Sequence, residues 1–274
     1  MNYGIANKSG KPDFNELRKI ICLAEKNSIN FIDTASAYGD SERIIGDLNI
    51  NHWKIISKLP QLSKYSASSI RKEFFKSLDN LKMNKIFGLL IHNSAELLSP
   101  NGAKLWNELK SLKSDGYITK IGVSIYNPDE LSSIFDNFSL DIVQGPFNIM
   151  DRRIKQTGWL DILAKNNIEF HARSIFMQGA LLLSPNVRKK IFNKWYELWD
   201  IYDDWHHEFE INQIDSAISF IKNEENLSKI LIGLDTSNQL SEIIHSFKKK
   251  QSLFPENIFS NDIDLLEPFR WKVL

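Results

Sequence analysis

The chain has 274 residues, of which 42% are hydrophobic, enough for the core of one large barrel or of two ordinary domains. Its 34 basic and 34 acidic residues balance, and no basic stripe interleaves with aromatic residues, so a nucleic-acid surface has no electrostatic support. The single cysteine excludes a disulfide framework within the chain and fits a reducing compartment. No apolar run resembles a signal peptide or approaches the roughly 20 residues of a membrane span. We therefore expect a soluble, cytoplasmic protein without nucleic-acid or membrane partners.

Short apolar runs recur from one end of the chain to the other and alternate with helical patterns. Each run is rich in Ile, Val, Leu or Phe without polar alternation, as a parallel strand buried on both faces requires. The predicted strands are 30–32, 54–57, 87–91, 121–125, 141–143, 168–172 and 230–232.

Apolar residues at helical spacing predict a helix next to each of these strands. In the first helix, Asp13 with Glu16 three residues later resembles a capping box. A later helix begins at Asn127-Pro128, with proline at the first helical position. Residues 185–207 interrupt the alternation of strands and helices. They are interpreted as a helical extension whose tryptophans are packing anchors. The apolar stripes include Phe14, Leu17, Ile21 and Ala24, then Ile70, Phe74, Leu78 and Leu81, and last Leu240, Ile243, Ile244 and Phe247.

Seven strand-helix units without a linker predict one α/β domain over residues 1–274, with a parallel sheet either doubly wound or closed. A closed (β/α)8 barrel needs eight strands. The opening Met1-Asn2-Tyr3-Gly4 lies almost directly before the first helix, so a first barrel strand is expected to be missing upstream.

Four ionisable side chains follow three consecutive predicted strands. Asp33 and Tyr38 follow the first strand, Lys58 ends the second and His92 ends the third. Carboxyl ends of parallel strands are where barrels and open α/β sheets build their sites. Each residue also has a structural explanation: a turn cap for Asp33, rim packing for Tyr38, a solvated strand end for Lys58 and backbone pairing for His92. Their recurrence on strand after strand favours function.

This set of side chains is chemically coherent as a proton donor. A free phenol has a pKa of about 10 and is too weak an acid to protonate an alkoxide readily at neutral pH. An adjacent ammonium favours the phenolate, a charge that Lys58 can supply while Asp33 orients the lysine. His92 can hydrogen-bond a substrate carbonyl, and Tyr38 then acts as general acid while hydride arrives.

The string Phe31-Ile32-Asp33-Thr34-Ala35, followed by Tyr38-Gly39-Asp40-Ser41-Glu42 and Gly46, resembles the signature of the aldo-keto reductase superfamily. The resemblance covers nearly the whole chain and implies a (β/α)8 TIM barrel and an NAD(P)H-dependent oxidoreductase that converts an aldehyde or ketone to an alcohol. It implies a catalytic tetrad of Asp33, Tyr38, Lys58 and His92. It also implies cofactor contacts at Ser124, Gln144, Arg173, Ser174, Gly233, Asp235, Ser237, Gln239 and Glu242.

Three positions depart from the family pattern. Ile125 stands where an asparagine usually follows the serine, which removes a polar contact to the nicotinamide carboxamide. Arg173 stands where an aromatic ring commonly stacks on the nicotinamide; its guanidinium can stack too or can grip an anionic group. Asp235 replaces a basic partner of the 2′-phosphate and would repel it. NADP(H) is therefore expected only because members of the family commonly use it, and NAD(H) is an open alternative.

Two further motifs are interpreted as structural. His206-His207-Glu208 lacks the spacing of a helical metal site, so no metal is expected. Lys248-Lys249-Lys250 lies near the end of the last helix, where cations complement the helix dipole.

Three functions remain open at this point. The leading hypothesis is a carbonyl reductase; the strings 173–179 and 3–10 resemble bacterial members of sugar and surface-polysaccharide metabolism and favour a sugar-derived carbonyl. The second is a weakly active or inactive cofactor-binding regulatory subunit, favoured by Ile125 and by the absent strand. The third is an unrelated barrel lyase or isomerase that uses Lys58 as a Schiff-base amine.

Overall fold

The computed structural model describes residues 12–61, 67–250 and 256–271. Two compact units make up the chain, and each is described by itself. The first contains Ser28–Gly145 and Asp161–His171, and the second contains 12–27, Pro146–Leu160, 172–250 and 256–271. The predicted lack of a first strand and the opening string 3–10 lie outside the described residues.

Strands follow one another in the sheet in the order of the chain, and the pairs from β1 to β5 are all parallel. The seven predicted strands are confirmed, although several begin or end at other residues; β4, for example, begins at Ile118 rather than at residue 121. The strands are β1 Phe31–Asp33, β2 Lys54–Leu59, β3 Ile86–Ile91, β4 Ile118–Ser124, β5 Ile142–Pro146, β6 Glu169–Arg173 and β7 Lys229–Ile230.

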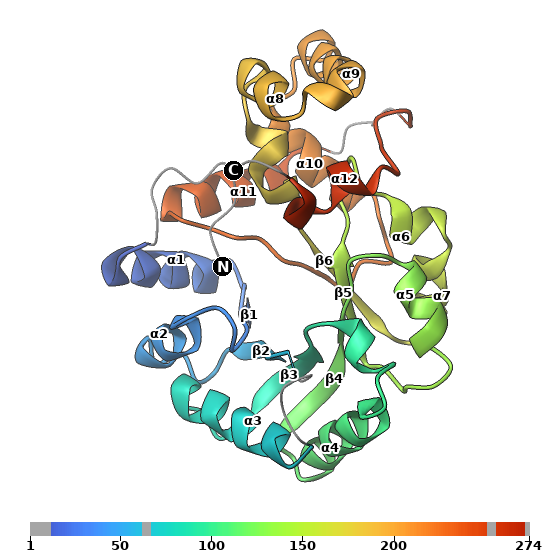
Figure 1. Ribbon diagram of the computed structural model, residues 1–274. Helices are drawn as coiled ribbons and strands as arrows, with labels where there is room; N and C mark the ends of the chain where they lie inside the picture. Colours follow the sequence, from blue (N-terminus) through green and yellow to red (C-terminus); the bar gives the residue numbers. More distant parts are fainter. Residues whose placement is uncertain (1–11, 62–66, 251–255, 272–274) are drawn as a thin grey trace. The chain divides into compact units, whose positions relative to one another are not determined.

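Helices of the first unit cover the outside of its strands, as α2, α3 and α4 do around β2 to β4 in Figure 1. The predicted apolar stripe of α3 is confirmed, because all four of its residues, Ile70 to Leu81, are buried. The helices are α2 Ser41–Asp47, α3 Ala67–Leu81, α4 Gly102–Ser114 and α5 Asp129–Ile134, with the 3-10 turn η2 at Ser94–Glu96; α7, Trp159–Lys165, begins in the second unit and ends in the first.

Apolar side chains fill the inner face of the first unit's sheet. Ile56 of β2, Leu90 of β3 and Ile142 of β5 form one buried cluster, although β2 and β5 are not neighbours in the sheet. A Cβ placed on Gly88 would lie 3.1 Å from Ile56 Cγ1 and 3.3 Å from Ile142 Cδ1. The sheet of this unit therefore curves until its inner side chains meet, as they do in the filled interior of a barrel.

In the second unit, α1 packs on α11 and a large apolar core lies around α9 and α10. The predicted helical extension is confirmed as α8 and α9, and Trp199 and Trp205 are buried in that core with Trp195 packed against it. The helices are α1 Phe14–Lys26, α6 Arg153–Gln156, α8 Pro185–Ile191, α9 Tyr196–Glu208, α10 Gln213–Lys222, α11 Ser237–Lys248 and α12 Ile263–Leu266, with 3-10 turns η3 Met177–Leu182, η4 Asn193–Trp195 and η5 Pro268–Arg270.

Two predicted helix starts are corrected in detail. Asp13 caps α1 by accepting from the Glu16 amide at 2.8 Å, but the Glu16 carboxylate accepts from Ser237 instead of closing a capping box. Pro128 precedes α5 as its N-cap rather than standing at the first helical position. In the second case the backbone turns into the helix one residue later than the proline pattern predicts.

Candidate active site

An ion pair between Lys58 and Asp33 forms the centre of the first unit's polar cluster. Asp33 ends β1, and Lys58 stands one residue before the end of the neighbouring β2. The Lys58 ammonium donates to Asp33 Oδ2 at 2.5 Å and to the Thr34 carbonyl at 3.0 Å. Only 1% of the Lys58 side chain is exposed. A buried charge is costly unless it is paired and hydrogen-bonded, and this one is both.

Tyr38 and His92 meet beside this ion pair. Lys58 Nζ lies 5.3 Å from the centroid of the Tyr38 ring. The rings of Tyr38 and His92 are 5.7 Å apart at an interplanar angle of 78°, an edge-on arrangement. His92 directly follows β3, so three neighbouring strands and one loop bring together all four residues of the predicted tetrad.

A tight loop between β1 and α2 positions Tyr38. The Tyr38 amide donates to the Ala35 carbonyl at 3.0 Å, which closes a turn. The Ser36 hydroxyl donates to the Lys58 carbonyl at 3.0 Å and ties the loop to β2. Gly39 then adopts φ +61°, a left-handed conformation that glycine adopts without steric cost. The phenol is therefore carried by a loop that is anchored on the strand of its predicted partner.

Below this loop lies a buried pair that the sequence motifs did not single out. The Ser57 hydroxyl donates to Glu42 Oε1 at 2.6 Å, and Glu42, on α2, is 3% exposed. This contact joins β2 to α2, the helix in which the Tyr38 loop ends. The signal in the sequence was a glutamate within the same string that carries Asp33 and Tyr38.

Ser124, the last residue of β4, stands opposite Gln144 in the middle of β5, and both are buried. Gln144 Nε2 donates to Asp33 Oδ1 at 2.7 Å, so its side chain belongs to the same polar cluster. The sequence motifs associated Gln144 with the cofactor and missed this contact with the tetrad. Ile125 is buried, and its amide donates to the Gln144 carbonyl at 2.8 Å.

The remaining predicted cofactor residues belong to the second unit. Arg173 ends β6, with Nη1 3.4 Å from the Ser174 hydroxyl, and Ser174 has φ 58°. Gly233 and Glu242 are exposed. Burial raises the pKa of Asp235, partly offset by Gln239.

At the start of α11, Glu16 of α1 receives both donors of Ser237. Glu16 Oε1 accepts from the Ser237 amide at 2.6 Å and from its hydroxyl at 2.7 Å. These bonds, first the one from the hydroxyl and then the one from the amide, lower the pKa of Glu16 to about 2. Gln239 closes a capping box with Thr236 and accepts from the Asp235 amide at 2.8 Å. This helix start therefore binds an anionic oxygen, which is the chemistry that a phosphate group would require.

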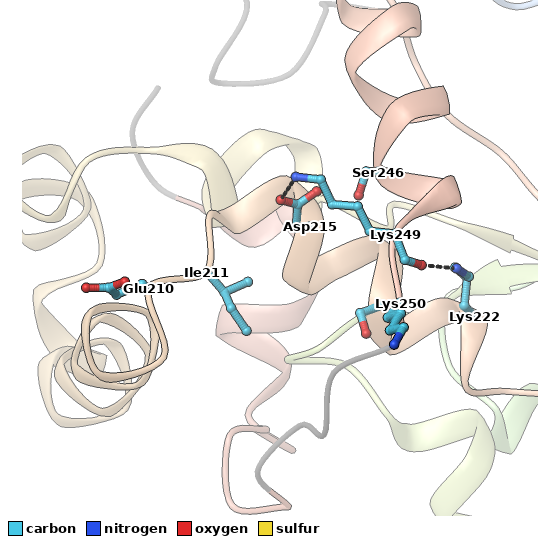
Figure 2. Close-up of a pocket in the computed structure, with 8 residues that line it drawn as sticks. Glu210, Ile211, Asp215, Lys222, Ser246, Lys249 and Lys250 are labelled. Atoms are coloured by element: carbon cyan, nitrogen blue, oxygen red, sulfur yellow. Dashed lines mark hydrogen bonds and ion pairs between the residues drawn. The ribbon is translucent and has the colours of Figure 1, made fainter.

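A cavity of about 130 Å³ in the second unit lies near the ends of α10 and α11 (Figure 2). Lys249 Nζ is 2.6 Å from Asp215 Oδ2, and Lys222 Nζ donates to the carbonyls of Phe247 and Lys249 at 2.7 and 2.9 Å. These contacts cover the last carbonyls of α11 and tie the helix to α10. None of the predicted site residues lines this cavity. It is lined by Glu210, Ile211, Asp215, Ser219, Lys222, Ser246, Lys249 and Lys250.

His206 is hydrogen-bonded through both ring nitrogens inside the second unit. Its Nδ1 is 2.6 Å from the Tyr202 carbonyl and its Nε2 is 2.7 Å from the Ser216 hydroxyl. Among the described residues, no group of three His, Cys, Asp or Glu side chains could hold a metal ion. Within the same residues, no helix has both the length and the apolar character needed to cross a bilayer.

Parallel strands that alternate with helices, with ionisable side chains gathered at the carboxyl ends of β1 to β3, define an α/β barrel of the kind that enzymes use. Residues 1–256 match the family model named Aldo/keto reductase family. The chain therefore belongs to the aldo/keto reductase family, and the seven described strands with their alternating helices are consistent with the family's (β/α)8 fold. The family supports the function of a carbonyl oxidoreductase in general.

Solved structures agree on the fold. The chain is similar to the holo form of the aldo-keto reductase AKR11C1 from Bacillus halodurans, with a TM-score of 0.75 and 16% identity over 88% of this chain and 84% of that chain. It is also similar to the glycerol dehydrogenase AKR11B4 from Gluconobacter oxydans, with a TM-score of 0.70 and 23% identity over 89% of this chain and 83% of that chain. A comparison with curated proteins gives no match.

Proposed function

We propose that the protein reduces an aldehyde or ketone to an alcohol with a nicotinamide dinucleotide, and that Tyr38 is the general acid. The observation that carries the proposal is the convergence of Asp33, Lys58, Tyr38 and His92, centred on a 2.5 Å ion pair. When bound, the reduced cofactor supplies a hydride to the carbonyl carbon. Tyr38 donates a proton to the carbonyl oxygen, and the Lys58 ammonium stabilises the negative charge left on the phenol oxygen. His92 hydrogen-bonds the same carbonyl and orients it.

The buried polar side chains of Ser124 and Gln144 suit the carboxamide of a nicotinamide, since both can exchange hydrogen bonds with an amide. Ser237, with an amide and a hydroxyl that both donate to one oxygen, suits a phosphate. We propose Arg173, Ser174, Gly233, Asp235, Gln239 and Glu242 as further contacts. Glu16 and Asp235 add negative charge near the start of α11, and this charge would repel a 2′-phosphate. We therefore propose NADP(H) as the cofactor, with NAD(H) as the alternative.

A sugar-derived carbonyl is the proposed substrate class. It is supported by the resemblance of the string 173–179 to bacterial sugar-metabolising members, and the fold is similar to that of a glycerol dehydrogenase. A cytoplasmic location is part of the same proposal and is supported by the single cysteine, Cys22, an exposed free thiol.

Two measurements test this function. Titration with NADPH and with NADH, followed by quenching of tryptophan fluorescence, gives the two dissociation constants. A carbonyl panel of aldoses, dihydroxyacetone and aromatic aldehydes then compares the wild type with Tyr38→Phe. We expect kcat to fall about 10² to 10⁴-fold in the variant while cofactor affinity is retained, as loss of a general acid predicts. A full-rate Tyr38→Phe variant would exclude the proposed role of the phenol.

A regulatory subunit that binds cofactor without turnover is the second candidate, and Ile125 in place of a polar carboxamide partner favours it. It predicts fluorescence quenching by a cofactor but no turnover on any carbonyl. The Schiff-base alternative is disfavoured because Lys58 is buried and pairs with the Asp33 carboxylate, which favours the charged ammonium over the neutral amine that a Schiff base requires. Borohydride trapping with substrate separates this alternative from the proposed reductase.

A further inference from the structure

One hydrogen bond of the polar cluster crosses the inside of the first unit's sheet. Gln144 of β5 donates from Nε2 to Asp33 Oδ1 at 2.7 Å, and Asp33 belongs to β1. Strands in a sheet lie about 4.8 Å apart, so four steps along a flat sheet would separate these strands by about 19 Å. The contact therefore exists because the sheet curves, and it joins residues 111 positions apart in the chain.

The chemistry of the two groups fixes the orientation of the Gln144 amide. An ionised carboxylate accepts hydrogen bonds and donates none, so the amide must turn its nitrogen toward Asp33. The two oxygens of Asp33 then have separate donors: Oδ1 receives Gln144 and Oδ2 receives Lys58. The carboxylate is thereby held from both sides against rotation.

This arrangement also determines where the lysine charge lies. The Thr34 carbonyl and Asp33 Oδ2 together hold the Lys58 ammonium at 5.3 Å from the centroid of the Tyr38 ring. If Asp33 lost its Gln144 donor, its carboxylate could turn and offer both oxygens to Lys58. The ammonium would then follow the carboxylate and shift relative to the phenol.

We propose that Gln144 is a positioning residue for carbonyl reduction, which holds the Asp33 carboxylate so that the Lys58 ammonium faces Tyr38. The inference rests on the proposed function and adds to it, since it gives Gln144 a task in proton donation besides its proposed contact with the cofactor. Gln144 acts through Asp33 and Lys58 and touches neither the substrate nor the phenol in this role.

Three variants test the inference on the full chain. Gln144→Met keeps a long unbranched side chain but removes the donor. Gln144→Glu restores a donor only when its carboxyl group is protonated. Ser124→Ala is the matched comparison, because Ser124 lies opposite Gln144 in the sheet and is also a proposed cofactor contact. For each variant we would measure the pH profile of kcat with 4-nitrobenzaldehyde, and cofactor dissociation constants by tryptophan fluorescence.

We expect Gln144→Met to lower kcat about 10- to 100-fold, the range that a small misplacement of reacting groups produces, and to displace the pH profile. Gln144→Glu should be equally slow at pH 8 and recover activity as the pH falls, because a protonated carboxyl can donate to Asp33. This recovery occurs within one protein sample and so does not depend on comparing folded fractions. Ser124→Ala should weaken cofactor binding and leave the pH profile in place.

The inference is wrong if Gln144→Met changes only the cofactor dissociation constant, with kcat and its pH profile as in the wild type. It is also wrong if Gln144→Glu stays slow at every pH at which the wild type is active. A wild-type chain that neither binds cofactor nor turns over would overturn the proposed function itself, and with it this inference. An active wild type with an unchanged Gln144→Met profile overturns the inference alone.

Discussion

Polar side chains gather at two places in the molecule, and they are held in different ways. On β1, β2 and β5, residues from separate strands contact one another, with Lys58 and Gln144 each 1% exposed around the partly buried Asp33. At the start of α11, partly or fully exposed residues cap the helix, and most partners lie within four positions of each other. Burial strengthens each contact of the first cluster and raises the cost of losing it, whereas water competes at the second. We therefore expect substitutions in the first cluster to have far larger effects.

The largest expected effect is on catalysis in the first cluster. Lys58→Met should lower kcat/KM for carbonyl reduction about 100-fold or more, the usual cost of removing one charge-stabilising donor. The side chains are of similar length, and Asp33 keeps its Gln144 donor in the variant. Steady-state kinetics measures the loss, and circular dichroism provides the folding control. Activity within a factor of about two of the wild type would show that this buried ammonium does not serve the reaction.

The next effect is on stability below the Tyr38 loop. Ser57→Ala removes the hydroxyl that donates to buried Glu42 and should lower the free energy of unfolding by about 1–3 kcal/mol, the penalty of an unsatisfied buried acceptor. Urea unfolding followed by tryptophan fluorescence measures it. The matched control is Ser57→Ala combined with Glu42→Met, which should cost less than the sum of the single changes. Strict additivity would mean that the two side chains do not interact.

A pH-dependent effect is expected from His206 in the core of the second unit. Burial, aided by the charge of Arg188, lowers the pKa of His206 below the value of about 6.5 expected in the unfolded chain. Below about pH 6.5 the unfolded state therefore binds the proton first, so the stability contributed by neutral His206 is present above that pH and is lost as the pH falls toward the folded pKa.

Thermal unfolding midpoints between pH 8 and 5 measure this loss, and His206→Gln is the control because an amide hydrogen-bonds without titrating. We expect the variant to show a flatter dependence on pH over that range. Parallel curves for the two proteins would contradict the assignment.

The smallest effect is expected at the start of α11. Ser237 lowers the pKa of Glu16 to about 2, from a value of about 4.3 in an unfolded chain. The stability that this carboxylate contributes is thus present above about pH 4.3 and is lost as the pH falls toward 2.

Glu16→Gln should lower the unfolding midpoint slightly at pH 7, and the difference from the wild type should shrink below about pH 4.3. Lys19→Met, which removes only the exposed partner of Glu16, is the control and should have almost no effect. A loss in Glu16→Gln as large as that in Ser57→Ala would remove the contrast between exposed and buried hydrogen bonds.

Much of the architecture could be predicted from the order of residues alone. Apolar runs located the strands, and the stripe from Ile70 to Leu81 predicted a helix whose apolar face is indeed buried. Such patterns are local, because an element buries its apolar side whatever its partner is. Three of the four predicted tetrad positions, Asp33, Lys58 and His92, were likewise marked by their place at or beside strand ends, and Tyr38 by the loop that follows the first of these strands.

Contacts between residues far apart in the chain could not be predicted from the sequence. Asp13 caps the Glu16 amide as the local pattern predicted, but the Glu16 carboxylate accepts from Ser237 because α1 packs on α11. Gln144 was associated with the cofactor, and its bond to Asp33 emerged only from the curvature of the sheet.

The sequence by itself therefore determined which segments become strands and helices, and which ionisable side chains stand where strands end. Only the tertiary structure decided which of them touch: that Lys58 has two acceptors, that Glu42 meets Ser57, and that Gln144 reaches Asp33. The physical reason is that periodicity reports the burial of one element at a time. Side-chain hydrogen bonds between distant strands depend on how the whole sheet curves. This curvature results from all residues of the sheet together, and no single residue determines it.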